Sequence, residues 1–500
     1  MTLSLDPCHS NPEPKKLTLT MQAPTSNSQL GQLPIAPTRL KLVLRRALSS
    51  QASLAVLLIL ALLGYAQVVP NILLVAILGF VSFKEFYQKI DRGLPLLELA
   101  NLIAVLQWTV GPALSYYFEI DHFKYYMYVS EPTFFSFALP ATCGFTAAIL
   151  GWGLVVDQRP LIAQKGQDFY FTYGIYLVTI AFIAEFVSGR APSSVQFFFF
   201  LLSQLRYVAA MYFLLSGHQY RFIATIIACS SLFVKSSSAG MFHDLLLWLA
   251  LIFCVWFPTA KWLHYRKPLV FALAALLVFT IQVVKQDYRV RMKAGENPSL
   301  FLMAFDYLSP SGRAWDQDVL SMAIVRLNQG WIISAVMNHV PATQPYANGE
   351  TVIESVVALA PRFLLPDKVG AGGRTNFRKY TGLAIANETS MCICVLGEAY
   401  ANFGEYGGIL FMIAFGAFLA FYYSRILRWA TSHPDFLFWI PLIFYQAIKA
   451  ETDMVVIVNQ IVKGSIVAFA GYLAMHKFYP PEMFQHNRSY PVQRPVRDLP

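Results

Sequence analysis

The segment LVFALAALLVFTIQVVKQDYRVRMK, residues 269–293, contains the boundary around which this chain is organised. It is apolar as far as Val284, close to the lower length limit of a membrane-spanning helix, and it becomes polar at Lys285. Polar sequence continues to about Cys394, whereas apolar runs dominate the chain on both sides. The pattern predicts a water-facing loop over 285–394 between two sets of membrane helices.

The composition points to a membrane protein. Hydrophobic residues make up 56% of the chain and charged residues 13%, whereas about 25% of residues are charged in soluble domains. Runs this continuous indicate helices rather than the alternating strands of outer-membrane barrels. The net charge of +10 is the excess of Lys and Arg that cytoplasmic loops carry, so we expect no nucleic acid partner.

The predicted fold class is all-α, a polytopic helical membrane protein with about 12 transmembrane helices and one long outward-facing helical loop. The predicted spans are 51–68, 70–84, 97–117, 132–156, 169–188, 195–215, 221–235, 240–258, 268–284, 405–424, 435–450 and 454–475. Lys and Arg are more frequent in the short connections on the side of the N-terminus. This bias predicts a plasma (inner) membrane protein with both termini in the cytoplasm and the long loop outside.

The predicted domains follow from this topology. They are a disordered cytoplasmic tail over 1–45, spans 1–9 over 46–284, the outer catalytic loop over 285–395, spans 10–12 over 396–476, and a cytoplasmic tail over 477–500. The six cysteines form neither a disulfide framework nor a zinc pattern. The histidines show no metal-ligand spacing, so we predict no metal site and no cofactor.

The outer loop carries eleven cations and two helical patches. Residues 319–340 are nearly long enough to cross a bilayer, but Arg326 near the middle makes a lipid-facing span costly. We therefore expect a surface helix or one packed on the bundle. Residues 350–365 are amphipathic and end or break at Pro361.

Arg-x-x-x-Gly occurs three times in the loop, at Arg291–Gly295, Arg326–Gly330 and Arg378–Gly382, whereas the composition of the whole chain gives about one match by chance. On a helix, Arg326 and Gly330 share a face, and the missing side chain would let a bulky ligand approach the guanidinium. Arginine suits a phosphate ligand because its planar fork binds two oxygens and keeps its charge. The alternative is that these arginines pair with lipid headgroups or with loop acids such as Asp316.

The segment TSMCICVLGEAYANFGEYGGILF, residues 389–411, leads into the tenth predicted span. Its Gly-Glu and Asn-Phe-Gly elements, together with the arginine-rich loop before it, resemble bacterial O-antigen and oligosaccharide repeat-unit polymerases. The resemblance covers about residues 220–425, and the first five spans match only in topology.

The resemblance implies a membrane glycosyltransferase that joins polyprenyl-diphosphate-linked oligosaccharides at the outer face of the plasma membrane, for O-antigen or exopolysaccharide. It implies that Arg326 and Arg378 hold the diphosphate. Related polymerases often place these arginines in two different loops, whereas here both fall in one. Membrane lipid and a chain-length regulator or flippase of the same pathway are the further implied partners.

Glycosyl transfer from a diphosphate needs fixed positive charge for the leaving group and a base for the acceptor hydroxyl. The candidate bases are His339, Glu350, Glu388 and Glu398. His339 follows Arg326 by several helical turns and is expected to line the same cavity, unless it is an ordinary interfacial histidine. Glu398 is either a base or the partner of a loop arginine. The expected catalytic residues are Arg326, Arg378, His339 and Glu398, and the expected substrate-binding residues are Arg291, Gly330, Arg374, Gly382, Lys235 and Asn402.

Three other functions remain open at this point. A ligase would use the same chemistry with another acceptor. A transporter or flippase of lipid-linked glycans would show two-fold internal repeats, and none is convincing here. A membrane protease would use Cys392 or Cys394 with His339, but an apolar neighbourhood does not activate a thiol.

Overall fold

The computed structural model describes residues 42–43, 48–120, 122–152, 155–156, 168–260, 264–309, 312, 316–360, 373–386 and 391–479. This part of the chain is helical apart from turns and one antiparallel pair of two-residue strands, β1 (Leu42–Val43) and β2 (Val155–Val156). The predicted all-α class is therefore confirmed for it. Nearly all of the two predicted tails, and the candidate base Glu388, lie outside the described residues.

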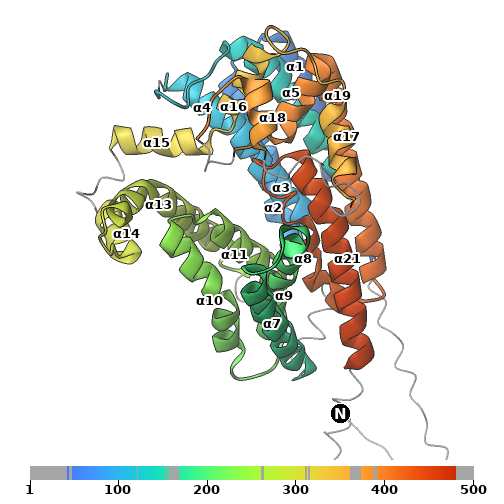
Figure 1. The fold of residues 1–500 in the computed structure, drawn as a ribbon. Coiled ribbons are helices and arrows are strands. Elements are labelled where there is room, and N and C mark those ends of the chain that lie inside the picture. Colours follow the sequence, from blue (N-terminus) through green and yellow to red (C-terminus); the bar gives the residue numbers. More distant parts are fainter. Residues whose placement is uncertain are drawn as a thin grey trace, which may run out of the picture. The chain divides into compact units, whose positions relative to one another are not determined.

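Figure 1 shows the arrangement of the helices. Up to the predicted loop they are α1 (Leu48–Ala66), α2 (Asn71–Lys89), α3 (Leu96–Val105), the π-helical turn η1 (Leu106–Val110), α4 (Gly111–Tyr117), α5 (Glu131–Trp152), α7 (Asp168–Ser188), α8 (Ser193–Ser203), α9 (Leu205–Leu215), α10 (Arg221–Ala239), α11 (His243–Trp256), η2 (Phe257–Thr259) and α13 (Lys267–Lys293). The remaining helices are α14 (Leu300–Leu308), α15 (Gln317–Leu327), α16 (Gly330–His339), α17 (Glu350–Val357), α18 (Arg374–Thr381), α19 (Cys394–Ala430), η4 (Pro434–Phe438), α20 (Ile440–Phe444) and α21 (Met454–Phe478).

Nine helical stretches in the described ranges are long and apolar enough to cross a membrane. They are Asn71–Lys89, Leu96–Tyr117, Glu131–Gly151, Phe169–Ser188, Val195–Leu215, Arg221–Ala239, Lys267–Lys293, Cys394–Ala430 and Met454–Phe478. Each coincides with a predicted span. Three shorter apolar helices, Gln51–Ala66, His243–Thr259 and Pro434–Phe444, lie where the other three spans are predicted.

The helix before the outer loop is longer than predicted, because α13 continues past Val284 to Lys293. Arg291 and Lys293 lie in the last turn of α13, where the helix dipole favours positive charge. The other side agrees with the predicted start near residue 405, because α19 has non-helical φ and ψ at Gly404 and its second part begins there. The part of α19 from Cys394 to this kink is an additional helical segment.

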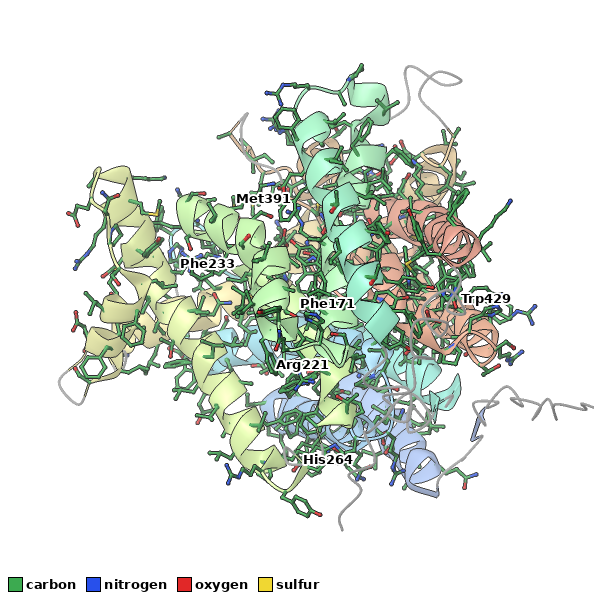
Figure 2. The ribbon with its side chains drawn as sticks, turned by 90° about the horizontal axis from the view of Figure 1, so that it is seen from below. Phe171, Arg221, Phe233, His264, Met391 and Trp429 are labelled. Carbon is green, nitrogen blue, oxygen red and sulfur yellow. The ribbon has the colours of Figure 1, made fainter. Side chains whose placement is uncertain are left out.

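Close packing at small residues joins α5 to α19 at the centre of the fold. A side chain at Gly416 would meet the backbone oxygen of Phe145 at 2.8 Å, and one at Gly144 would meet Ile413 at 2.6 Å. Small residues at such crossings let helix backbones approach each other. Figure 2 shows side chains filling the spaces between the helices, for example at Phe171 of α7, whose ring lies 3.9 Å from that of His218.

The predicted helix over 319–340 is two helices. α15 and α16 meet at a bend of 61°, and α15 runs crosswise to α21 (Figure 1). The predicted amphipathic helix over 350–365 begins at Glu350 as expected, and α17 ends at Val357. Beyond α17, the carbonyl of Ala358 lies 3.5 Å from the Lys463 ammonium in the middle of α21. The outer segment thus packs along α21.

Candidate functional site

A large apolar cavity lies between α2, α3 with η1, α11, α13 and α15. Its volume is about 1430 Å³, which exceeds the roughly 300–1,000 Å³ of ordinary small-molecule sites. Along α13 the lining extends from Val270 to Gln282, and twelve residues of helix correspond to about 18 Å. The cavity therefore has the length and character to hold an extended apolar chain.

Aromatic rings close one end of this cavity. The ring of Phe271 on α13 lies 5.8 Å from that of Phe83 and 5.9 Å from that of Phe86, both on α2. One helical turn before Phe271, Lys267 forms an ion pair of 2.6 Å with Asp91. Edge-on ring contacts of this kind pack well, so this end of the cavity is aromatic.

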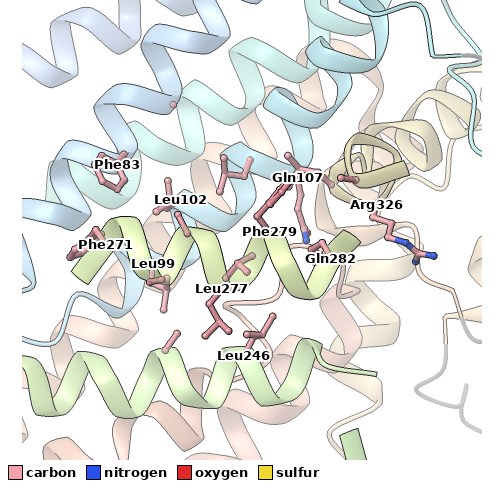
Figure 3. A pocket seen from close by; sticks show the side chains of 18 of the residues that line it. Phe83, Leu99, Leu102, Gln107, Leu246, Phe271, Leu277, Phe279, Gln282 and Arg326 are labelled. Carbon is pink, nitrogen blue, oxygen red and sulfur yellow. The ribbon is translucent and has the colours of Figure 1, made fainter. Parts of the chain in front are cut away.

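The opposite end is polar and contains Arg326. Figure 3 shows Arg326 at the far end of the lining from Phe83 and Phe271, with its guanidinium pointing away from the apolar side chains. Gln107 of η1 and Gln282 of α13 also line this end. The Arg326 Nη2 donates a hydrogen bond of 2.7 Å to Gln286 Oε1. The cavity therefore changes from aromatic to cationic along its length.

Two further cations lie beside Arg326. Lys285 and Arg289 are four residues apart on α13, on the face that also carries Gln282 and Gln286, and both interact electrostatically with the guanidinium. In the described ranges, none of the three forms an ion pair with a carboxylate. Three like charges at the mouth of a dry cavity repel one another unless an anion compensates them.

The break between α15 and α16 places Arg326 at this end. The backbone NH of Gln329 donates 3.1 Å to the carbonyl of Gln107, within the π-helical turn η1. The Asn328 side chain donates 2.8 Å to Ser115 Oγ of α4. A Cβ at Gly111 would lie 2.7 Å from the Asn328 backbone, so only glycine permits this approach. π-helical turns often mark functional sites, and this one fixes the end of α15 against the cavity.

The sequence pattern of α15 explains why it covers the cavity. Leu320, Ala323, Ile324 and Leu327 line the cavity at the spacing of one helical face. Arg326 is adjacent to this face, so its stem reaches the lining while its charge extends beyond it.

The other predicted arginines lie elsewhere. Arg378 is exposed on α18, where its Nη2 donates 2.6 Å to the carbonyl of Ile385, and it does not line the cavity. Arg374 begins the same helix and also lies outside the cavity lining. Arg291 is exposed in the last turn of α13, close to Arg289 in sequence. The structure thus does not join Arg326 and Arg378 in one cavity.

His339 and two predicted glycines serve packing. His339 ends α16, beyond the 61° bend, so it does not line the Arg326 cavity as the continuous helix implied. Its ring packs against Gly382, where a Cβ would lie 2.8 Å from Cε1 and where φ is +69°. At Gly330 a Cβ would lie 2.2 Å from Pro112 Cγ. The space beside Gly330 is therefore filled by protein rather than open to a ligand.

Glu398 belongs to a buried clamp between two helices. It is 1% exposed, and its Oε2 accepts 2.8 Å from the backbone NH of Met454, the first residue of α21. In return, Asp453 Oδ1 accepts 3.2 Å from the backbone NH of Cys394, the first residue of α19. Each carboxylate thus caps the other helix. The helix contact made by Glu398 therefore accounts for the Gly-Glu element without assigning Glu398 the role of a base.

The remaining motif residues hold the outer segment on α19. Asn402 is buried, and its side chain donates 2.8 Å to Thr351 Oγ1 and accepts 3.0 Å from the NH of Gly349. Gly404 has φ of +67°, which bends α19 where Tyr346 packs. The predicted substrate contact at Asn402 therefore has a structural role in this conformation.

Lys235 is engaged on another side of the bundle. This exposed residue of α10 pairs with Glu185 of α7, and Glu185 also binds Arg206 of α9 at 2.6 Å. Lys235 is not among the residues that line the cavity. The three side chains link α7, α9 and α10.

The cysteines and histidines give little support to the other chemistries. Burial raises the pKa of the Cys392 thiol, and the neighbouring Asp453 raises it further, which suppresses the thiolate a protease needs. Within the described ranges, no three His, Cys, Asp or Glu side chains are arranged to hold a metal ion.

A pair of residues that the sequence analysis did not single out lies next to the polar end. His243 Nδ1, at the start of α11, lies 2.9 Å from Glu451 Oε1. Glu451 Oε2 lies 3.5 Å from Gln329 Nε2, at the α15–α16 break. No local spacing could reveal this pair, because its members come from segments far apart in the chain.

The chain was compared with known proteins. The family model described as "Domain of unknown function (DUF8712)" matches residues 142–428. The matched region includes α11, α13 and α15 with Arg326, but not α2, α3 or Glu451. No curated protein and no solved structure gives a significant match.

Proposed function

The chain belongs to the DUF8712 family, and we propose that it is a membrane glycosyltransferase acting on glycans linked to polyprenyl diphosphate. In this proposal it polymerises oligosaccharide repeat units for O-antigen or exopolysaccharide at the outer face of the plasma membrane. In this proposal the nine long apolar helices and the three shorter ones of the described residues all cross the membrane, and the segment from α14 to α18 lies on the outer side.

One observation carries the proposal: an apolar cavity of about 1430 Å³ ends at Arg326, beside Lys285 and Arg289, and none of these three cations forms a direct ion pair with a carboxylate of the described residues. A ligand that satisfies both ends has a long hydrocarbon chain and a compact, multiply charged anion. Polyprenyl diphosphate has this composition. Drug-sized polar ligands would leave most of the apolar lining uncovered.

The lining favours a lipid chain over water. A prenyl chain along the roughly 18 Å of α13 would contact apolar walls throughout, and because it enters from the hydrocarbon of the bilayer, its affinity depends on packing against these walls rather than on removal from water. The aromatic end would limit how far the chain enters. The diphosphate would then stop at Arg326, outside the hydrocarbon region.

The cationic end has the chemistry that the reaction requires. When the glycosidic bond to the diphosphate breaks, negative charge develops on the leaving oxygen. The Arg326 guanidinium binds phosphate oxygens in pairs, and its hydrogen bond to Gln286 fixes its orientation before the substrate arrives. Lys285 and Arg289 add charge that stabilises the leaving diphosphate.

The test is a gel of lipid-linked glycans from cells that lack this protein and carry variants of it. Wild type should give a ladder of polymers, and Arg326→Ala should leave one-unit product. Arg190→Ala is the matched control, because Arg190 is an exposed arginine between α7 and α8 that stacks on Phe186 and is not among the residues lining the cavity. A wild-type ladder from Arg326→Ala, at normal protein level, would overturn the proposal.

A further inference from the structure

His243 and Glu451 form a hydrogen-bonded pair that no predicted function uses. The Nδ1 of His243 lies 2.9 Å from Glu451 Oε1, and the side chains are 34% and 41% exposed. Both groups are therefore accessible from outside the protein. A satisfied core histidine would be buried, so this exposure is the first reason to consider chemistry here.

The hydrogen bond sets the tautomer of the imidazole. Because Glu451 is a carboxylate, Nδ1 carries the proton and donates it, which leaves a lone pair on Nε2. Among the described residues, Nε2 of His243 has no hydrogen-bond partner. A histidine held at Nδ1 by a carboxylate and free at Nε2 has the arrangement of a general base.

The pair lies next to the polar end of the cavity. His243 is the first residue of α11, and Leu246, one turn later, lines the cavity (Figure 3). Glu451 contacts Gln329 at 3.5 Å, three residues after Arg326. Lys285 also acts electrostatically on Glu451. The pair and the three cations therefore belong to one site.

The electrostatics favour an ionised Glu451. Burial raises the pKa of Glu451, but the hydrogen bond and charge of His243, with Lys449 and Lys285, bring it below its usual value. The other charged group next to the pair is Asp244, which forms an ion pair of 2.7 Å with Lys449. A carboxylate that stays ionised is a poor base but stabilises the imidazolium that a neighbouring histidine forms.

We propose that His243 is the general base of the proposed transferase and that Glu451 positions it. The inference rests on the proposed function. The acceptor hydroxyl oxygen bonds to the anomeric carbon of the donor, and the bond from that carbon to the diphosphate oxygen breaks. The hydroxyl proton passes to His243 Nε2, and the bonding electron pair leaves with the diphosphate, next to Arg326.

The experiment uses the full-length protein in detergent and a lipid extract from cells lacking it, which contains the single repeat unit on its lipid carrier. Initial rates are measured between about pH 5 and 8. His243→Ala should lower kcat by about 10²- to 10⁴-fold with little change in KM. Glu451→Gln should lower kcat with little change in KM, because the carboxylate that accepts from Nδ1 and orients the imidazole is lost. His218→Ala is the control, since that ring stacks on Phe171 of α7 and is not part of the cavity lining.

The outcomes separate this inference from the function beneath it. Loss of rate in both Arg326→Ala and His243→Ala, with normal thermal stability, supports the transferase function and the assignment of His243 as the base. A His243→Ala protein that polymerises at the wild-type rate, when Arg326→Ala does not, overturns the base assignment and leaves the transferase standing. An unchanged rate in both variants overturns both. A wild-type kcat in Glu451→Gln removes the positioning role.

Discussion

Replacing Glu398 with alanine tests whether this residue is a clamp or a base. Glu398 is 1% exposed, and its Oε2 is the acceptor for the backbone NH of Met454 at the start of α21. Alanine removes that acceptor and leaves a buried NH unpaired, which costs about 1–3 kcal/mol. Glu398→Ala should therefore lower the thermal midpoint of the purified protein clearly.

The matched variant is Glu398→Gln, which keeps an oxygen acceptor at nearly the same position. We expect its thermal midpoint to be close to that of wild type, because the Met454 NH keeps its partner. Tryptophan fluorescence during heating in detergent measures all three proteins. The reasoning is refuted if alanine leaves the midpoint unchanged or if glutamine lowers it equally. A normal midpoint in Glu398→Gln with a lost glycan ladder would restore the catalytic role that the sequence predicted.

Three further predictions concern the clamp, the bend and the cavity. Burial raises the pKa of Asp453 to about 6, above its value of 3.8 when unfolded. Protonation of Asp453 therefore favours the folded protein, and the free energy of unfolding falls by up to about 3 kcal/mol as the pH rises through about 6. Thermal midpoints measured across this range should fall with pH in wild type but not in Asp453→Asn, and parallel profiles would contradict this. Gly111→Ala should destabilise the folded protein by about 1–3 kcal/mol, because its Cβ would meet the Asn328 backbone at 2.7 Å. Gly189→Ala is the control, because no atom lies near a Cβ at that position. Equal denaturation midpoints for the two variants would exclude the close approach. Ala274→Trp should fill the cavity and so reduce the amount of polyprenyl lipid bound to the purified protein. Ala272→Trp, on the same helix but outside the lining, should bind the lipid normally. Mass spectrometry of the bound lipid distinguishes the two variants.

Much of the fold was predictable because apolar runs carry their own signal. All nine long apolar helices lie at predicted spans, since each run must bury its backbone groups in its own hydrogen bonds. The ends were less predictable. Helix α13 continues to Lys293, where exposed turns need no apolar residue, and α19 begins with a buried segment from Cys394 to the kink at Gly404.

The site was predicted only in part. The Arg-x-x-x-Gly pattern and the family resemblance selected Arg326, and the structure places it at the end of a cavity. The sequence did not reveal the bend at Asn328. This bend depends on the carbonyl of Gln107, which lies in the π-helical turn η1 of a distant segment and accepts from the NH of Gln329. For the same reason His339 was expected near Arg326 and His243 was not. Tertiary contacts between distant segments, rather than spacing, bring His243 to Glu451.

Lipid bound to the purified protein tests the central claim most directly. Wild type, extracted in a mild detergent and analysed by mass spectrometry, should carry polyprenyl phosphate or diphosphate lipid. Replacing Arg326, Lys285 and Arg289 together with glutamine should remove it while the thermal midpoint is retained, because among the described residues these cations form no direct ion pair that the substitutions would break. Equal amounts of such lipid on both proteins, or only uncharged lipid on wild type, would contradict the account.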